Sequence, residues 1–172
     1  VALAQVLPVL TQVEAHSALA ALLAQHPRWV LKPLADGSSH GLVHFQSAAQ
    51  IEHAAQVLSQ QHTAYLAEVF VEGRALTVGV VDEQDGPVAF PVSEVRRVPG
   101  GGFDYQGKSL GRGTEEITPA ALSPSEQTAA QALAVLTHQA LGCFGYSRTD
   151  MILSSSGVVL LEINTLPGMT KA

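Results

Sequence analysis

The chain has 172 residues, 47% of them hydrophobic, which suits one globular domain or two small lobes with a buried core. Its formal net charge is −6 at pH 7 and its nine Lys and Arg residues are scattered, which argues against a nucleic-acid partner. No run of about 18 apolar residues occurs, so neither a membrane span nor a membrane partner is expected. The single cysteine, Cys143, lies in an apolar stretch and is interpreted as a buried thiol rather than a reactive one, in a reducing cytoplasm.

The first part of the chain predicts a small α+β unit. An apolar run over residues 1–10 leads into a strand, and Ala and Leu at helical spacing predict a helix over residues 17–25. Two extended runs, 29–32 and 41–45, flank a polar turn and predict a hairpin. Ser47 is placed to cap the next helix.

The remainder predicts a second α+β unit. Short β-rich runs at 65–71, 76–81 and 88–92 are expected to be antiparallel neighbours. Six glycines between residues 99 and 118 predict a long mobile loop that covers a site. A helix over 126–141 and strands over 146–153 and 158–163 follow, and the boundary near Glu68 gives lobes 1–67 and 68–172.

Lys32 and the turn that follows it form the first candidate site. Glycine lets a backbone approach a ligand closely, and serine hydroxyls and N–H groups bind phosphate oxygens beside a lysine countercharge. The residues are Lys32, Gly37, Ser38 and Ser39. A plain hairpin turn with a solvated lysine is the alternative.

Three oxygen-bearing side chains near the end of the chain form a candidate magnesium site. Asp150 lies in one apolar strand, whereas Glu162 and Asn164 lie two residues apart, and so on one face, of the next strand. Magnesium prefers one or two carboxylates together with water and phosphate oxygens. A salt bridge from Arg148 to either acid is the alternative.

Cations and an apolar strand complete the set of candidates. Arg148 shares the face of Asp150 and is suited to an oxyanion or a transferring phosphoryl group, or to simple charge balance. Lys108, in the glycine-rich loop, either reaches a phosphate or stays solvated. Glu68 either precedes a strand backbone at residues 69–71 that can pair with an adenine edge, or is merely a solvated strand residue. The histidines show no zinc spacing and are interpreted as surface residues.

Taken in order, these motifs resemble the ATP-grasp superfamily and, within it, the D-alanine–D-alanine ligase family. The segments that carry the resemblance are Lys32-Pro33 with Gly37-Ser38-Ser39, Glu68 before Glu72-Gly73-Arg74, residues 145–150, and residues 162–170. The implied fold is α+β, with two lobes whose antiparallel sheets hold ATP between them. The implied reaction phosphorylates one D-alanine carboxylate with ATP and joins it to the amine of a second D-alanine, giving D-alanyl-D-alanine for peptidoglycan.

The resemblance also implies residue roles. Lys32 and Lys108 would contact ATP phosphates under a flap with Gly37, Ser38 and Ser39. Glu68, Val69, Phe70 and Val71 would hold adenine. Asp150, Glu162 and Asn164 would bind two magnesium ions, or manganese. Arg148 would face the acyl phosphate, with Ser38, Lys108 and the Gly168 amide as further catalytic groups.

Two positions depart from the family pattern. Ala75 stands where the family usually places a ribose-binding acid, and Ser109 stands where a tyrosine commonly follows the lid lysine. These departures keep another ATP-grasp peptide or amide ligase, or a D-alanine–D-lactate ligase, as an alternative; a noncatalytic nucleotide-binding module is a third. The chain is expected to be a fragment, inactive alone, of an enzyme that the resemblance allows to be a homodimer.

Overall fold

The computed structural model describes residues 4–35, 40–97 and 114–168. Gly37, Ser38, Ser39, Lys108 and Ser109 lie outside the described residues. The chain divides into two compact units, the first ending at Phe70 and the second beginning at Val71. None of the described helices is long and apolar enough to cross a membrane.

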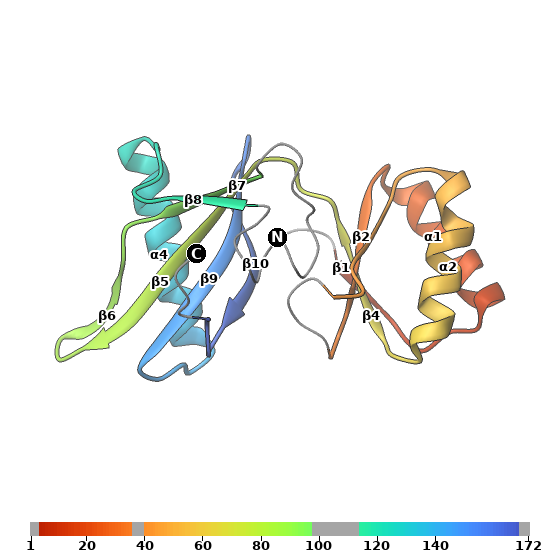
Figure 1. Ribbon diagram of the computed structural model, residues 1–172, viewed down its shortest axis with the longest axis horizontal. Helices are drawn as coiled ribbons and strands as arrows, with labels where there is room; N and C mark the ends of the chain where they lie inside the picture. Colours follow the sequence, from red (N-terminus) through yellow and green to blue (C-terminus); the bar gives the residue numbers. More distant parts are fainter. Residues whose placement is uncertain (1–3, 36–39, 98–113, 169–172) are drawn as a thin grey trace. The chain divides into compact units, whose positions relative to one another are not determined.

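The first unit is a four-stranded sheet with two helices on one face (Figure 1). Its elements are β1 (Ala4–Leu7), α1 (Gln12–Gln25), β2 (Trp29–Pro33), β3 (Val43–Phe45), α2 (Ala48–Gln61) and β4 (Tyr65–Val69). The strand order is β1-β4-β2-β3, with antiparallel neighbours throughout. The expected hairpin is therefore confirmed.

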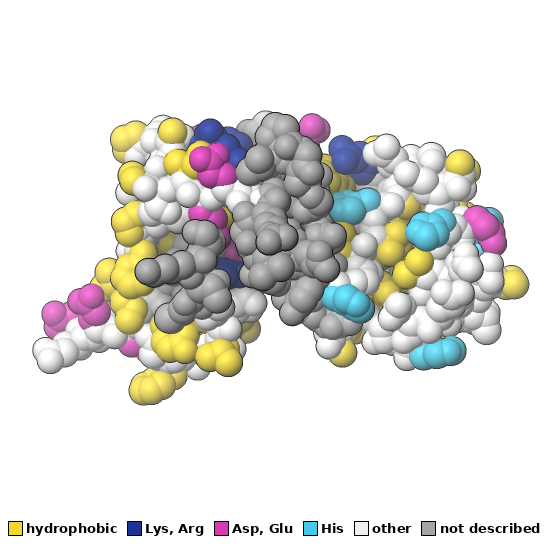
Figure 2. All heavy atoms as spheres, in the orientation of Figure 1, with side chains coloured by type: hydrophobic (Ala, Val, Ile, Leu, Met, Phe, Trp, Pro, Cys, Tyr) yellow, Lys and Arg dark blue, Asp and Glu magenta, His cyan; other side chains and the backbone are white. Residues whose placement is uncertain are grey.

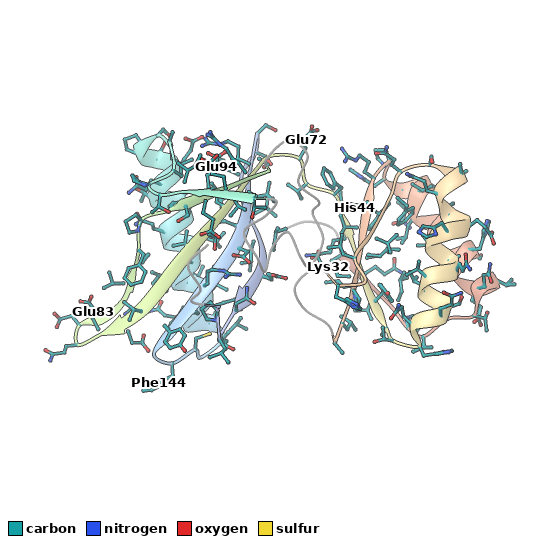
Figure 3. The ribbon with its side chains drawn as sticks, viewed as in Figure 1. Lys32, His44, Glu72, Glu83, Glu94 and Phe144 are labelled. Atoms are coloured by element: carbon teal, nitrogen blue, oxygen red, sulfur yellow. The ribbon has the colours of Figure 1, made fainter. Side chains whose placement is uncertain are left out.

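Alternation along the strands separates a core face from a polar face in this unit. Trp29, Phe45 and Tyr65 are each about 1% exposed and pack with apolar residues of both helices. Lys32 lies on the opposite face of the sheet (Figure 3). The period of two in a strand thus buries one set of side chains and presents the other.

One helix start and one helix cap in the first unit differ from the expectation. α1 begins at Gln12, not near Ser17, because Thr11 and Glu14 form a reciprocal capping box that the apolar spacing does not reveal. α2 begins directly after Ser47, as expected, but the Ser47 side chain makes no capping hydrogen bond. Instead its hydroxyl donates to Gln50 at 3.4 Å.

The second unit is a larger antiparallel sheet with one helix across a face (Figure 1). Its elements are β5 (Arg74–Glu83), β6 (Gly86–Ala89), β7 (Ser93–Arg97), β8 (Thr114–Ile117), α4 (Pro124–Ala140), β9 (Tyr146–Ser154) and β10 (Gly157–Asn164). The strand order is β10-β9-β5-β7-β8, and β6 pairs with β5. α4 starts where Ser123 and Glu126 form a second capping box. Small and aliphatic side chains of β5 and β9 pack against α4 around Ala130 and Ala134.

Two expectations about the strands are wrong. β4 pairs with β1 and β2 of the first unit and not with β5, because the chain passes from one unit to the other after Phe70. The chain divides after Phe70, close to the boundary expected near Glu68, so β4 lies wholly in the first unit. Residues 114–117 were expected to lie in the glycine-rich loop, but they form β8 and pair with β7.

The apolar stretch around Cys143 is not buried. Leu141 is 63% exposed and Phe144 is 94% exposed, and Phe144 projects away from the unit (Figure 3). Cys143 itself is partly exposed. The expectation of a buried thiol is therefore wrong, because this stretch is the turn between α4 and β9 rather than part of either element.

Candidate functional site

Neighbouring strands of the second unit carry a row of polar side chains on the sheet face opposite α4. Ser147, Thr149 and Met151 of β9 are buried, so the alternating residues Arg148 and Asp150 point to the other face. Thr77 of β5 is the register partner of Asp150 and joins that face.

Asp150 is the centre of this row. Arg148 donates to both of its oxygens, from Nε at 3.0 Å and from Nη2 at 3.1 Å. The Thr77 hydroxyl donates to Oδ1 at 2.6 Å, and the Asn164 amide donates to Oδ2 at 3.3 Å. The salt bridge considered as the alternative is therefore present, and it fixes the orientation of both charged groups.

The charge of Arg148 is secured by its neighbours. Burial lowers the pKa of the Arg148 guanidinium, but the hydrogen bond to Asp150 and the charges of Asp150, Glu116 and Glu162 raise it more, so the net pKa lies above its ordinary value. The side chain remains 37% exposed. Arg148 is thus a permanently charged group that a ligand can reach.

β10 brings two further oxygen donors beside Asp150. Glu162 is the register partner of Asp150, and Asn164 is the partner of Arg148. An irregularity between Leu160 and Glu162 shifts the register, which places Glu162 on the Asp150 face. Carboxylate and amide oxygens are hard donors of the kind that magnesium takes, so the set fits this ion. No group of three His, Cys, Asp or Glu side chains suited to a metal occurs in the described part of the chain. The three-residue ligand set thus depends on the amide of Asn164 and stays a prediction.

A hollow of about 440 Å³ lies on the same face, beside Arg148. Two hydroxyl side chains, Ser93 and Thr118, are part of its lining, and their oxygens Oγ and Oγ1 lie 2.5 Å apart. Phe90 covers Gly79, where an added Cβ would lie 2.9 Å from the ring. The hollow is lined by Thr77, Gly79, Val80, Phe90, Pro91, Ser93, Glu116, Thr118, Tyr146, Ser147, Arg148, Pro167 and Gly168. The second unit thus places Gly168 and Arg148 around one cavity.

The first unit brings together the two charged residues that the sequence singled out there. Lys32 of β2 and Glu68 of β4 form an ion pair on the polar face of the sheet. Their side chains are only 22% and 16% exposed, so this pair is partly shielded from water. The turn residues expected beside Lys32 lie outside the described residues.

The strand expected to meet adenine ends in an aromatic contact. The Arg28 guanidinium lies 3.7 Å from the centre of the Phe70 ring, and the His44 ring meets Phe70 edge-on at 5.8 Å. The Phe70 N–H donates to the Arg28 carbonyl at 3.0 Å, and Val69 pairs with Trp29 in the sheet. The Phe70 N–H is therefore already used within the first unit.

Sequence reasoning missed a buried histidine. The expectation that the histidines lie at the surface fits those visible on the first unit (Figure 2), but His138 is 1% exposed. Its Nδ1 lies 2.8 Å from the Ser147 hydroxyl and its Nε2 lies 3.2 Å from Asp82. The helical spacing could have predicted this burial, because His138 follows the buried Ala134 by four residues and so lies on the same face of α4.

A charged cluster on β5 and β7 of the second sheet was also missed. Glu94, labelled in Figure 3, is 5% exposed and accepts hydrogen bonds from Arg74 at 2.6 Å and from Arg96 at 2.9 Å. The hydrogen bond from Arg74, and to a lesser extent the one from Arg96, lowers the pKa of Glu94 to about 2. This cluster lies on the α4 side of the sheet, where the partner of Glu94 in the neighbouring strand is the buried Leu76.

Comparisons with known proteins agree with this architecture. A D-alanine–D-alanine ligase of Leptospira interrogans is 37% identical over 146 residues, covering 82% of this chain and 41% of that protein. The VanG D-Ala:D-Ser ligase of Enterococcus faecalis superposes with a TM-score of 0.79 at 26% identity, over 99% of this chain and 49% of its own. A D-alanine–D-alanine ligase of Bacillus anthracis solved with ATP superposes with a TM-score of 0.74 at 18% identity, over 99% of this chain and 51% of its own. At this identity the likeness is one of fold.

The chain thus spans about half the length, or less, of these relatives. Its α+β architecture of antiparallel sheets matches the ATP-grasp ligase structures. The family model described as "D-ala D-ala ligase C-terminus" matches residues 11–172. The chain belongs to this family.

Proposed function

We propose that this chain is the nucleotide- and magnesium-binding part of an ATP-dependent carboxylate–amine ligase. The full-length protein would join two D-alanine molecules. One observation carries the proposal: a permanently charged guanidinium lies beside hard oxygen donors on one sheet face. The residues of this row are Arg148, Asp150, Glu162 and Asn164. The 37% identity to a D-alanine–D-alanine ligase supports the choice of substrate.

Asp150, Glu162 and Asn164 would hold two magnesium ions. Magnesium would neutralise the charge that develops on the transferring phosphoryl group. The Asn164 amide N–H already donates to Asp150, which orients the Asn164 amide oxygen away from that carboxylate. Glu162 is exposed and makes no hydrogen bond or ion pair to another described residue, so its carboxylate can take up a ligand without breaking a contact.

Lys32 and Glu68 would exchange partners when nucleotide binds. ATP phosphates would replace Glu68 as the partner of Lys32, and the released carboxylate of Glu68 could accept a hydrogen bond from the adenine amino group. Val69, Phe70 and Val71 would supply apolar and backbone contacts. Gly37, Ser38, Ser39 and Lys108 would complete the phosphate contacts.

Arg148 would act where charge develops in the acyl-transfer step. ATP transfers its γ-phosphoryl group to a carboxylate oxygen of the first D-alanine and leaves as ADP. The amine of the second D-alanine then attacks the acyl carbon, phosphate departs, and the nitrogen loses a proton. Arg148 and the Gly168 N–H, which line one hollow, would stabilise the oxyanion of this step.

The test measures ADP release by the full-length protein with magnesium, ATP and D-alanine. We expect release that depends on all three, and a folded sample without it would reject the ligase. Glu162→Gln should weaken magnesium-dependent nucleotide binding about tenfold, because it removes a ligand charge at constant volume. Glu83→Gln, an exposed acid at the end of β5 (Figure 3), is the matched control and should bind like the parent protein. Equal affinity of the Glu162 variant and the parent would contradict the metal site.

A second candidate is a ligase with a different acceptor. The 26% identity to a D-Ala:D-Ser ligase favours it, as does Ser109 at the position where a tyrosine commonly follows the lid lysine. Assays with D-alanine, D-serine and D-lactate as acceptors separate the candidates. D-alanyl-D-alanine as the dominant product would remove the second one.

A further inference from the structure

Glu116 is a carboxylate at the candidate site to which the proposed chemistry gives no role. It lies in β8, where its register partner is Val95, and it lines the hollow beside Arg148. Its neighbour Glu115 is the partner of Arg96, and adjacent residues of a strand point to opposite faces of the sheet. Of the two glutamates, Glu116 therefore belongs to the face that carries Arg148.

The Glu116 carboxylate is not engaged by another side chain. Among the described residues it makes no hydrogen bond and no ion pair, whereas three side chains hold the carboxylate of Asp150. The negative charge of Glu116 nevertheless contributes to raising the pKa of the Arg148 guanidinium. The two groups thus influence each other without contact and line one hollow from separate strands.

The hollow offers one side chain that can take up a proton at neutral pH. Among the described residues that line it, the titratable ones are Glu116, Tyr146 and Arg148. A phenol and a guanidinium carry their protons at this pH, whereas a carboxylate is an acceptor. Asp150 and Glu162 belong to the proposed magnesium set and are not part of this lining. Glu116 is therefore the candidate base.

The joining reaction needs such a base. An amino acid carries its nitrogen mainly as ammonium at neutral pH, and this form has no lone pair with which to attack. In the proposed function, Arg148 and the Gly168 N–H stabilise the oxyanion in this hollow. The attacking nitrogen bonds to the same carbon as that oxygen, so the nitrogen enters the same hollow. A carboxylate in its lining is placed to receive the proton.

We propose that Glu116 is the general base that deprotonates the amine of the second amino acid, an inference that rests on the proposed function. The ammonium N–H donates to a carboxylate oxygen of Glu116, the proton moves to that oxygen, and the freed lone pair attacks the acyl carbon. The carbon–oxygen bond to phosphate then breaks, and phosphate leaves with a second proton from the nitrogen. Because Glu116 is exposed, its proton passes to water and the carboxylate is restored.

The experiment compares the full-length parent with Glu116→Gln and with the adjacent control Glu115→Gln. Two amines are supplied: D-alanine, and hydroxylamine, which is largely unprotonated at neutral pH and traps the acyl phosphate as a hydroxamate. Glu116→Gln should lower kcat for D-alanyl-D-alanine about a hundredfold, because general-base catalysis is lost. Its KM for ATP and its rate of hydroxamate formation should stay within about twofold of the parent values, because hydroxylamine already has a free lone pair. The control should behave like the parent with both amines.

The pH profile gives a readout that a loss of structure would not produce. As the pH rises toward the pKa of the free amine, more D-alanine arrives deprotonated, so the deficit of Glu116→Gln should shrink. Glu116→Asp keeps a carboxylate on a shorter side chain and should recover part of kcat. An unchanged kcat, an equal loss of dipeptide and hydroxamate, the same loss in the control, or a deficit that is constant with pH would overturn the inference.

The hydroxylamine reaction separates this inference from the ligase proposal. A folded parent that forms neither dipeptide nor hydroxamate would reject the ligase, and the role of a base with it. If the parent forms both products and Glu116→Gln forms both at the parent rates, the ligase stands and only the role of Glu116 is rejected.

Discussion

The two units of the chain build their interiors from different residues. The first unit buries Trp29, Phe45 and Tyr65 under its two helices. The second unit packs smaller aliphatic residues against one helix. Every polar or charged side chain that is buried among the described residues belongs to the second unit: Thr77, Glu94, Thr137, His138, Ser147 and Thr149.

This difference matches the distribution of the candidate site. Buried polar groups need partners, and their hydrogen bonds fix side chains in one orientation. In the second unit such bonds hold Asp150 and its neighbours on the face that carries the proposed chemistry. The first unit thus depends on apolar packing, and the second depends in addition on charge and hydrogen bonding.

The largest expected effect is on the packing of the first unit. Trp29→Ala should lower the free energy of unfolding of this unit by about 4 kcal/mol, because it leaves a cavity and removes the Nε1 hydrogen bond to the Leu22 carbonyl at 2.8 Å. Urea unfolding followed by circular dichroism measures the loss. Val13→Ala, at a side chain 81% exposed, is the control and should cost less than about 0.5 kcal/mol. A similar cost for both variants would contradict the packing argument.

The next effect concerns the charged cluster of the second unit. The folded-state pKa of Glu94 is lowered from 4.5 to about 2, so its stabilisation is fully present above pH 4.5 and is lost as the pH falls toward 2. Arg74 and Arg96 are 37% and 50% exposed, so solvent screening limits the effect to about 2 kcal/mol.

The test of this cluster is Glu94→Gln. At pH 7 it should lower the free energy of unfolding of the second unit by that amount, and below pH 4.5 the difference from the parent should shrink. Urea unfolding across this pH range measures both. A difference that is constant with pH would show that the carboxylate charge is not the cause.

Helix capping gives a smaller and paired comparison. Ser123 accepts a hydrogen bond from the Glu126 N–H at 3.3 Å, whereas Ser47 caps nothing although it precedes α2. Ser123→Ala should therefore cost about 1 kcal/mol, and Ser47→Ala should cost less than about 0.5 kcal/mol. Chemical denaturation of both variants measures the two costs. Equal costs would show that sequence position, and not the hydrogen bond, governs the effect.

The smallest expected effect is a gain in stability. The Thr149 hydroxyl is buried in the second unit and has no hydrogen-bond partner among the described residues. Thr149→Val keeps the shape of the side chain and removes the unsatisfied group. It should therefore raise the free energy of unfolding by about 0.5 to 1 kcal/mol, which a higher midpoint of thermal unfolding would show. Thr128→Val is the comparison, because the Thr128 hydroxyl donates to the Pro124 carbonyl at 2.8 Å. A loss of stability in the Thr149 variant would mean that the hydroxyl has a partner outside the described contacts.

Local chemistry explains the parts that were predicted correctly. The β2–β3 hairpin, the helix after Ser123 and the β9–β10 pair all follow from the spacing of apolar residues and from turn or capping residues within a few positions. The candidate site row shares this origin, because Arg148, Asp150, Glu162 and Asn164 lie on two consecutive strands.

Non-local contacts explain the errors. β4 and β5 are separated by only four residues, yet hydrogen bonding places them in different sheets. The partners of the buried His138 are Ser147, nine residues later, and Asp82, 56 residues earlier. No local pattern predicts such pairs.

By itself, the sequence determined the α+β class, the order of the chemistry-bearing residues and the family they resemble, because periodicity and motif order are properties of neighbouring residues. Only the tertiary structure decided which strands form which sheet, which charges are paired and which side chains line the hollow beside Arg148. Strand pairing brings residues of distant segments together, and burial then sets the energy of each charge. Both depend on the folded chain as a whole.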